Sequence, residues 1–357
     1  MKGSWKIGLG LLVSGLFLWW AFRGEDLGEI WSRLTSADPI WLLAAGAIST
    51  AGGLIRALRW RLLLSPLGVQ SSLYSRWAAL NIGFMVTNVY PGRLGEIVRP
   101  LALSRMAPVT MSGALGTVVL ERALDTVALV LLLLITLLAP AFPDEATILG
   151  RSIGFAVSGS VLVAVALLVI LGAMIVWPSR LIGVVLALVR ILPGNLEEGM
   201  TKKLESFVGG LQLLRRPVQL AKALAWSVCL WIWMATSFWA AFQAFGIELG
   251  FTAALFTQCV VSVFVAIPAA PGFIGTMQAG VAVSVSEVFS VAAEPTLSLA
   301  IGYHLAGFIP VTILGLHYAS RLGLRMSSVE SDVEDALGKE EPPACRPPGP
   351  EDPDDEA

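Results

Sequence analysis

Long apolar runs alternate with short polar segments along most of this chain. Six of the runs have the length that an α-helix needs to cross a hydrocarbon layer ~30 Å thick, about 20 residues. These predicted spans are Trp5–Phe22, Pro39–Leu63, Thr110–Ala139, Gly154–Trp177, Lys222–Phe245 and Thr296–Ser320. The pattern predicts an all-α polytopic membrane protein, with the first run kept as an anchor helix because it ends in aromatic residues and not in a cleavage site.

Two further apolar segments do not fit simple spans. They are Arg76–Arg105 and Thr252–Ala293, and each is interrupted near its middle by a Pro-Gly pair. The uninterrupted stretch from Trp77 to Tyr90 would form a helix of about 21 Å, which is too short to cross. We therefore predict two re-entrant helical hairpins that are broken at Pro91-Gly92 and Pro271-Gly272.

The distribution of Lys and Arg predicts the orientation, because short cytoplasmic loops are enriched in these residues. With the amino terminus inside, the outer loops hold only Arg23, Arg33 and Arg151. This predicts a multi-pass protein of the cell membrane with both termini in the cytoplasm. It also requires each hairpin to begin and end on one side, the first on the inside and the second on the outside.

The expected elements then repeat in inverted order. A span, an internal hairpin and a span are followed later by a span, an external hairpin and a span, which is typical of transporters with inverted repeats. A chance arrangement is the alternative, since the halves share no visible sequence identity. We expect a transmembrane domain over residues 1–326, with cytoplasmic amphipathic helices at 178–217, and a disordered acidic tail over 327–357.

Composition supports a chain whose solvent is lipid. Of its 357 residues 56% are hydrophobic and 14% are charged, and the net charge of −2 comes from the acidic tail. Its three cysteines do not form a disulfide framework, and its two histidines, His304 and His317, have no cysteine nearby. We expect no disulfide, no metal, no cofactor and no nucleic-acid partner.

The string from Asn88 to Pro100, at the first Pro-Gly turn, is the first candidate for chemistry. If a helix follows Gly92, then Arg93, Glu96 and Arg99 share one face with a net positive charge that suits a phosphate. A loop at the membrane surface with local ion pairs is the alternative.

The second candidate lies within a predicted span. Glu121 and Asp125 are one helical turn apart, and Arg122 can reach Asp125. Charges at this depth cannot face lipid. They either hold helices together or line a hydrated path, and their excess negative charge makes Arg93 and Arg99 natural partners.

The third candidate is the second Pro-Gly turn, where Gly272 and Gly275 allow close backbone approach and Gln278 offers a neutral donor and acceptor. By contrast Arg56, Arg59 and Arg61 end a predicted helix, and we interpret them as anchors at the cytoplasmic surface.

These motifs together resemble one family. Arg59-Trp60, the PGRLGE sequence from Pro91 to Glu96, Glu121-Arg122 with Asp125, and PGFIG from Pro271 to Gly275 are similar to the lysylphosphatidylglycerol synthase transmembrane region, a flippase-like membrane family. The resemblance covers about Lys6 to Arg325. Where the family usually has a second glycine and a glutamate in the later motif, this chain has Phe273 and Gln278. Better-known members carry a soluble aminoacyltransferase domain after the membrane region, and we expect this chain to lack it.

Three functions follow from these observations. The first is a translocator or binding transporter for an anionic or amphoteric phospholipid, whose partner is a membrane lipid with a phosphate headgroup. The second is a membrane enzyme, or an enzyme subunit, that transfers a headgroup; we favour a protein that is not an enzyme, because no nucleophile and base pair is recognisable. The third is a scaffold for a separate lipid-modifying enzyme. Assembly with such an enzyme or with a second copy of the chain stays open.

Overall fold

The computed structural model describes residues 4–90, 93–143, 147–148, 151–152, 206–267 and 270–324, with isolated positions between 159 and 177. Its elements are α1 (Ser4–Phe22), α2 (Leu27–Thr35), α3 (Pro39–Leu64), η1 (Ser65–Leu67), α4 (Leu73–Val89), α5 (Gly95–Ser104), α6 (Met111–Leu137), β1 (Thr147–Ile148), β2 (Arg151–Ser152), η2 (Gln212–Arg215), α10 (Pro217–Ala244), α11 (Phe251–Ala266), η3 (Pro271–Phe273), α12 (Thr276–Val281), η4 (Ala282–Glu287) and α13 (Ala293–Arg321). The fold is α-helical, apart from the antiparallel pair of two-residue strands β1 and β2.

Three of the described helices are long and apolar enough to cross a membrane, at Pro39–Leu67, Pro217–Ala244 and Ala293–Arg321. α6 is 27 residues long and would reach about 40 Å, but it carries the charged residues Glu121, Arg122 and Asp125. In α1 the apolar helix found is the shorter stretch Gly10–Phe22. The expected span Gly154–Trp177 lies almost wholly outside the described residues, as do most of 178–217 and all of 327–357.

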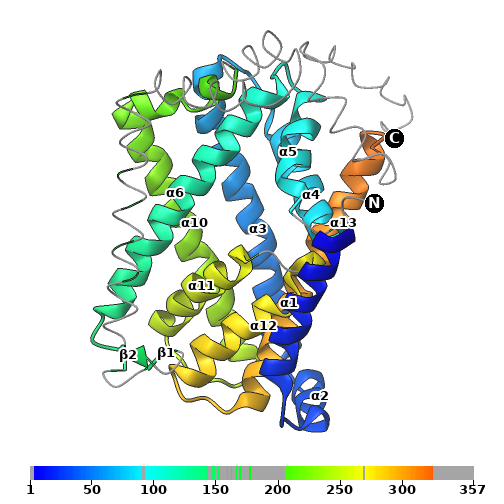
Figure 1. Ribbon diagram of the computed structural model, residues 1–357, viewed down its shortest axis with the longest axis vertical. Coiled ribbons are helices and arrows are strands. Elements are labelled where there is room, and N and C mark those ends of the chain that lie inside the picture. The colour runs from blue at the N-terminus through cyan, green and yellow to red at the C-terminus, as the bar shows by residue number, and fades with distance from the viewer. Residues whose placement is uncertain are drawn as a thin grey trace, which may run out of the picture.

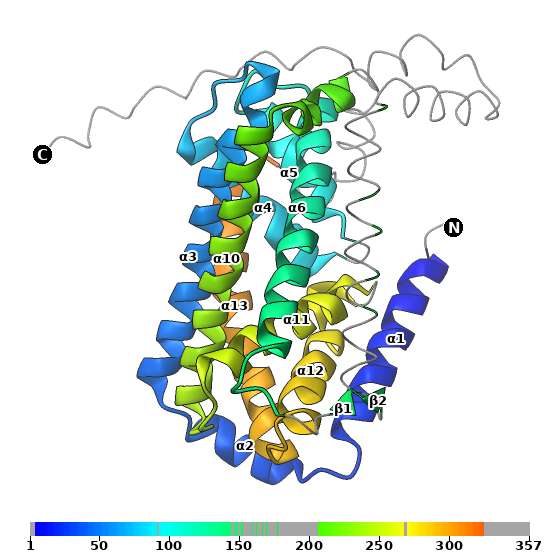
Figure 2. The ribbon, with the colours of Figure 1, turned by 90° about the vertical axis from the view of Figure 1, so that its left-hand side faces the viewer.

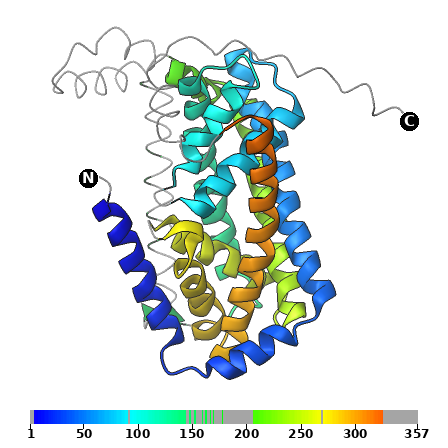
Figure 3. The same ribbon diagram turned by 90° about the vertical axis from the view of Figure 1, so that its right-hand side faces the viewer.

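The long helices stand side by side and define two ends of the molecule. α3 and α10 run together over nearly the full height (Figure 2), and α13 runs the full height beside α3 (Figure 3). The end that holds α2 and the first residue of α3 is called the α2 end here, and the opposite end, where α3 passes into η1, is called the η1 end. Local signals in the sequence fix the start of α3. Asp38 accepts hydrogen bonds from the N–H groups of Ile40 and Trp41, and a proline is the first residue of the helix.

The two Pro-Gly segments form helical hairpins that occupy opposite halves of the molecule. α4 and α5 lie in the half toward the η1 end, whereas α11 and α12 lie in the half toward the α2 end (Figure 1). Close backbone contact holds the arms of each hairpin together. A Cβ added at Gly83 of α4 would lie 2.8 Å from the carbonyl oxygen of Gly95 in α5, and one added at Gly280 of α12 would lie 3.0 Å from the Cα of Val261 in α11.

The helices form two sets of four, α3 to α6 and α10 to α13, and both sets pack in the same way. If α3, α4, α5 and α6 are exchanged with α10, α11, α12 and α13 respectively, then each pair of contacting helices becomes another pair that is also in contact. Thus α3 packs on α4 as α10 packs on α11, α4 on α13 as α11 on α6, α3 on α13 as α10 on α6, and α5 on α6 as α12 on α13. This exchange pattern, together with hairpins in opposite halves, is the arrangement that an inverted repeat requires.

Candidate functional site

Two carboxylates of α6 lie at the centre of a buried ion-pair network. Glu121 and Asp125 are one turn apart, and both side chains are fully or almost fully buried. Thr110 caps the helix by accepting a hydrogen bond from the N–H of Gly113, so the register of α6 is fixed near its start. Buried carboxylates are stable only when cations and hydrogen bonds surround them.

Arg59 of α3 is the central cation of this network. Its guanidinium hydrogen-bonds Asp125 and lies 3.1 Å from Glu121 (Nη2 to Oε1), and its side chain has 0% exposure. It also donates to the hydroxyl of Ser227 in α10. Arg56, one turn earlier, has its Nη1 3.6 Å from Oδ2 of Asp125 and is also buried.

The interpretation of Arg56 and Arg59 as surface anchors is therefore wrong. α3 continues to Leu64 and is covered by α10, so that residues near its end face another helix and not the membrane surface. Arg61 is exposed, and its role as an anchor stays a prediction.

Arg99 of α5 joins the first sequence cluster to the second. Its Nη1 and Nη2 donate to the two oxygens of Glu121 at 3.1 and 2.7 Å, a bidentate geometry that fixes both side chains. The guanidinium also stacks 3.8 Å from the ring centre of Trp60, whose Nε1 donates to the hydroxyl of Thr117. The Arg59-Trp60 pair and Arg99 thus act on one site from two helices.

Arg122, Glu96 and Arg93 form the exposed edge of the network. Arg122 contacts Glu121 at 2.9 Å and Asp125 at 3.5 Å, but 39% of its side chain is exposed. It interacts electrostatically with Glu96, which is 3.6 Å from Arg93. The charged residues of both sequence clusters are therefore continuous in space.

Arg93 does not share a helical face with Glu96 and Arg99, contrary to expectation. α5 begins only at Gly95, and Arg93 has a φ of 57°, in the left-handed region that non-glycine residues rarely adopt. Because its chain turns away from the helix, Arg93 reaches the second hairpin, whereas Arg99 turns inward toward Glu121.

The tips of the two hairpins meet. Arg93 donates to the carbonyl oxygen of Val265 at the end of α11, and its guanidinium lies over the ring of Phe273. A Cβ added at Gly272 would lie 3.3 Å from the carbonyl oxygen of Asn88. Asn88 in turn donates to the hydroxyl of Thr312 in α13, at 2.9 Å. Residues on either side of the first Pro-Gly pair thus contact the second Pro-Gly turn and a long helix.

Gln278 holds the second tip in place. Its Oε1 accepts from the N–H of Gly275 at 2.8 Å, and its Nε2 lies 3.1 Å from Nδ1 of His304 in α13. Gly275 has a φ of +90°, and an added Cβ there would lie 2.5 Å from the carbonyl oxygen of Ser14 in α1. The glycine is therefore required both by its backbone conformation and by the close approach of α1.

The network carries more positive than negative charge. Arg56, Arg59, Arg99 and Arg122 surround only two carboxylates, so two positive charges are in excess, where the sequence predicted an excess negative charge. Within the described part of the chain, several guanidinium nitrogens here are buried without a hydrogen-bond partner, namely Nη1 of Arg56 and Nε of Arg59, Arg93, Arg99 and Arg122. An anion bound to the cluster would balance its excess positive charge and accept hydrogen bonds from its unpartnered nitrogens.

Sequence reasoning placed ten residues at the site, and the structure divides them into two linked groups. The ion-pair network holds Arg99, Glu121, Arg122 and Asp125, and the meeting tips hold Asn88, Gly272, Gly275 and Gln278, with Arg93 and Glu96 between them. Arg59, Arg56, His304 and Phe273 were missed as site residues. The charge balance contained a signal for the first two, because Arg122 alone could not neutralise both Glu121 and Asp125. Among the described residues no cluster of His, Cys, Asp or Glu could hold a metal ion.

Helices of spanning length, with charged residues buried between them, define a multi-pass α-helical membrane protein. The sequence matches the family described as the lysylphosphatidylglycerol synthase TM region over residues 7–315, and the chain belongs to that family. A UPF0104 membrane protein of Methanothermobacter thermautotrophicus is 23% identical over 322 residues, which cover 87% of this chain and 93% of the relative. A second UPF0104 membrane protein, from Methanocaldococcus jannaschii, is 26% identical over 118 residues, or 32% of this chain and 35% of the relative.

Proposed function

We propose that the protein is a translocator for an anionic or amphoteric phospholipid and that the ion-pair network binds the phosphate of the headgroup. The observation that carries the proposal is the excess of two positive charges around Glu121 and Asp125. Uncompensated charge inside a membrane protein is costly. A lipid phosphate at the network supplies the missing negative charge and accepts hydrogen bonds from nitrogens that are otherwise unpartnered.

The accessible part of the network indicates where the phosphate binds. Arg59 and Arg99 are committed to carboxylates and are buried, whereas Arg93 and Arg122 are partly exposed. Glu96 lies near both and adds a carboxylate that suits the amine of an amphoteric headgroup. The phosphate therefore binds between Arg93 and Arg122, with the buried arginines contributing their field from behind.

The meeting of the hairpin tips supports translocation over simple binding. Broken helices that end at mid-height of a bundle leave backbone groups that only protein or a polar ligand can satisfy. Arg93 belongs both to the network and to the contact between the tips, so headgroup binding at Arg93 competes with its hydrogen bond to Val265 and its contact with Phe273. Binding thereby loosens the contact that closes the path.

Reconstitution into vesicles tests the proposal. Purified protein is placed in vesicles that contain fluorescent phosphatidylglycerol or phosphatidylethanolamine, and transfer between leaflets is followed by quenching from outside. Arg93→Gln and Arg122→Gln should each reduce the rate at least tenfold, whereas Arg23→Gln, at an exposed position that follows α1, should not. Wild-type rates in both network variants, with proteins that melt normally, would contradict a phosphate site here.

A further inference from the structure

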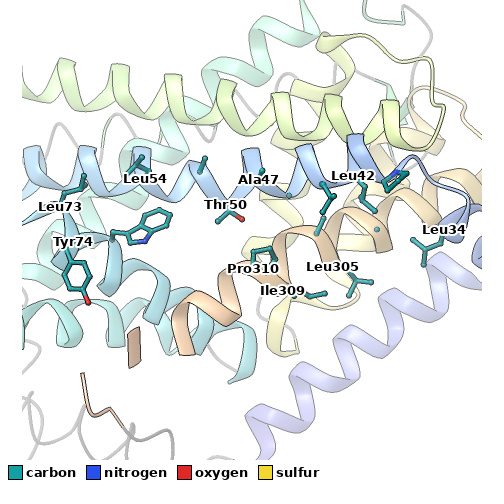
Figure 4. Close-up of a pocket in the computed structure, with 17 residues that line it drawn as sticks. Leu34, Leu42, Ala47, Thr50, Leu54, Leu73, Tyr74, Leu305, Ile309 and Pro310 are labelled. Atoms are coloured by element: carbon teal, nitrogen blue, oxygen red, sulfur yellow. The ribbon is translucent and has the colours of Figure 1, made fainter. Parts of the chain in front are cut away.

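A long apolar groove runs between α3 and α13 on the face of the molecule away from the ion-pair network. Its volume is about 1290 Å³, and its lining comes from α3, α13, the end of α2 and the start of α4 (Figure 4). On α3 the groove residues Ala47, Ala51 and Leu54 point to the side opposite Arg56 and Arg59, as the helical repeat requires. The groove is therefore separate from the proposed phosphate site.

The groove opens sideways, toward the surface that the membrane covers. Its walls include Leu43, which is 74% exposed, and Leu54, Leu305 and Ile309, which are partly exposed, and all of them belong to helices of spanning length. At the base of the groove α3 and α13 touch, since a Cβ added at Gly46 would lie 2.7 Å from the carbonyl oxygen of Ala306. A hydrocarbon chain can thus enter from the bilayer without passing a polar barrier.

The length of the groove distinguishes it from ordinary membrane contact. Along α3 it extends from Pro39 to Leu54, which is about 23 Å at 1.5 Å per residue. One leaflet of a ~30 Å hydrocarbon core is only about 15 Å deep. A disordered acyl chain within one leaflet would therefore leave the far part, near Leu73 and Trp77, uncovered, whereas a chain held extended would fill it.

The α2 end of the groove continues into a polar recess. Pro39 lines both, and the recess, of about 710 Å³, is lined by Arg33, Ser36, Asp38 and Gln243 among others. Among the described residues that line the recess, Arg33 is the only cation and Asp38 the only anion. Both keep capacity for a ligand, because Nη1 of Arg33 is not used in its contacts with Glu29 and Oδ2 of Asp38 is not used in capping α3. Opposite charges in one recess complement a headgroup that carries both a phosphate and an amine.

We propose that this groove and recess form a second lipid site, which holds one phospholipid with an amine-bearing headgroup in the recess and one acyl chain extended along α3 and α13.

Photo-crosslinking tests the site in the full-length protein. The protein is reconstituted with phosphatidylethanolamine that carries a diazirine either near the headgroup or at the end of one acyl chain. The first probe should label residues near Pro39, and the second should label Leu54, Tyr74 or Trp77 at the far end. Labelling of the far end should fall at least fivefold when phosphatidylglycerol carries the same terminal probe.

A matched pair of variants separates the groove from the general lipid surface. Ala47→Trp fills the groove and should abolish labelling of the far end, whereas Leu316→Trp, an exposed position of α13 outside the groove, should leave it unchanged. If the terminal probe labels only the half near Pro39 in the wild-type protein, the chain is not extended and the proposal fails, whether or not Ala47→Trp folds. Crosslinks between two copies at Leu43 or Ile309, with no lipid label there, would assign the groove to a dimer and also overturn it.

Discussion

The guanidinium of Arg93 lies over the ring of Phe273, with 5.8 Å between its Cζ and the ring centre. Each of these residues directly follows a Pro-Gly pair, and each has a left-handed backbone, with φ of 57° and 60°. They are therefore equivalent positions of the two hairpins, and the contact between them is one of the contacts that join the halves of the molecule. A bulky residue in this conformation is strained by about 1–2 kcal/mol.

At position 273 the side chain should stabilise the fold through its contact with Arg93, whereas the strained backbone should destabilise it. Phe273→Leu removes the ring and keeps the strained conformation, whereas Phe273→Gly removes both. We expect Phe273→Gly to be more stable than Phe273→Leu by about 1–2 kcal/mol, because glycine adopts positive φ without strain. Thermal unfolding in detergent measures the difference, and a Phe273→Leu protein that is as stable as Phe273→Gly would show that the strain is absent.

Removal of Arg59 should be the most damaging change in the network. Arg59→Gln leaves two buried carboxylates without their central cation, and we expect a loss of about 3–5 kcal/mol in the free energy of unfolding. Arg33→Gln, in an exposed pair, should cost less than about 1 kcal/mol. The double variant Arg59→Gln with Asp125→Asn should recover part of the loss. If Arg59→Gln were as stable as Arg33→Gln, the result would argue against a buried ion pair at Arg59.

The first hairpin should tolerate no side chain at its point of closest contact. Gly95→Ala places a Cβ against the carbonyl oxygen of Gly83, so α5 must move away from α4. We expect a loss of about 1–3 kcal/mol, the usual cost of overpacking. Gly15→Ala in α1 is the matched control, because nothing lies within 4 Å of its Cβ. Chemical denaturation of both proteins in the same detergent makes the comparison.

The position of the proton on His304 follows from its neighbour. Since Oε1 of Gln278 accepts from Gly275, its amide nitrogen faces Nδ1 of His304 and needs an unprotonated acceptor there. We expect the neutral tautomer with hydrogen on Nε2, which nitrogen-15 NMR of labelled histidine identifies. Gln278→Glu should convert the ring to imidazolium, since a carboxylate favours a charged partner. His317 serves as the internal reference in the same spectrum.

The predicted orientation can be tested by labelling at the two ends. In a protein whose cysteines at positions 229, 259 and 345 are changed to serine, Glu248→Cys at the α2 end should react with an impermeant maleimide on intact cells. Gln70→Cys, exposed at the η1 end, should react only after lysis. The reverse pattern would place the α2 end in the cytoplasm and would invert the expected topology.

The apolar pattern predicted the long helices well, because span length and hydrophobicity are local properties of the sequence. α3, α6, α10 and α13 begin and end within about five residues of the expected bounds, a typical error for boundaries. The Pro-Gly pairs also fall at the breaks between the helices that form each hairpin. These features depend on residues close together in the chain.

The buried network could be predicted only in part, because the burial of a charged side chain depends on tertiary packing. Arg59 and Arg61 look alike in sequence, yet one is fully buried under α10 and the other is exposed. The spacing of Arg93 to Glu96 and Arg99 fits one helical face, but the backbone at the turn overrides that spacing. The contact of Gln278 with His304 joins residues on two helices, and no spacing in the sequence indicates it.

The two halves of the molecule pack in the same way, but they carry different charges. The hairpin near the η1 end carries Arg93, Glu96 and Arg99, whereas the equivalent hairpin near the α2 end offers Gln278, which contacts His304 of α13. If the protein translocates a lipid as proposed, the headgroup passes from a strongly cationic site to one that only hydrogen-bonds. On that proposal, we expect binding to be tighter on one side of the midplane than on the other, and the side of release to depend on this difference in charge.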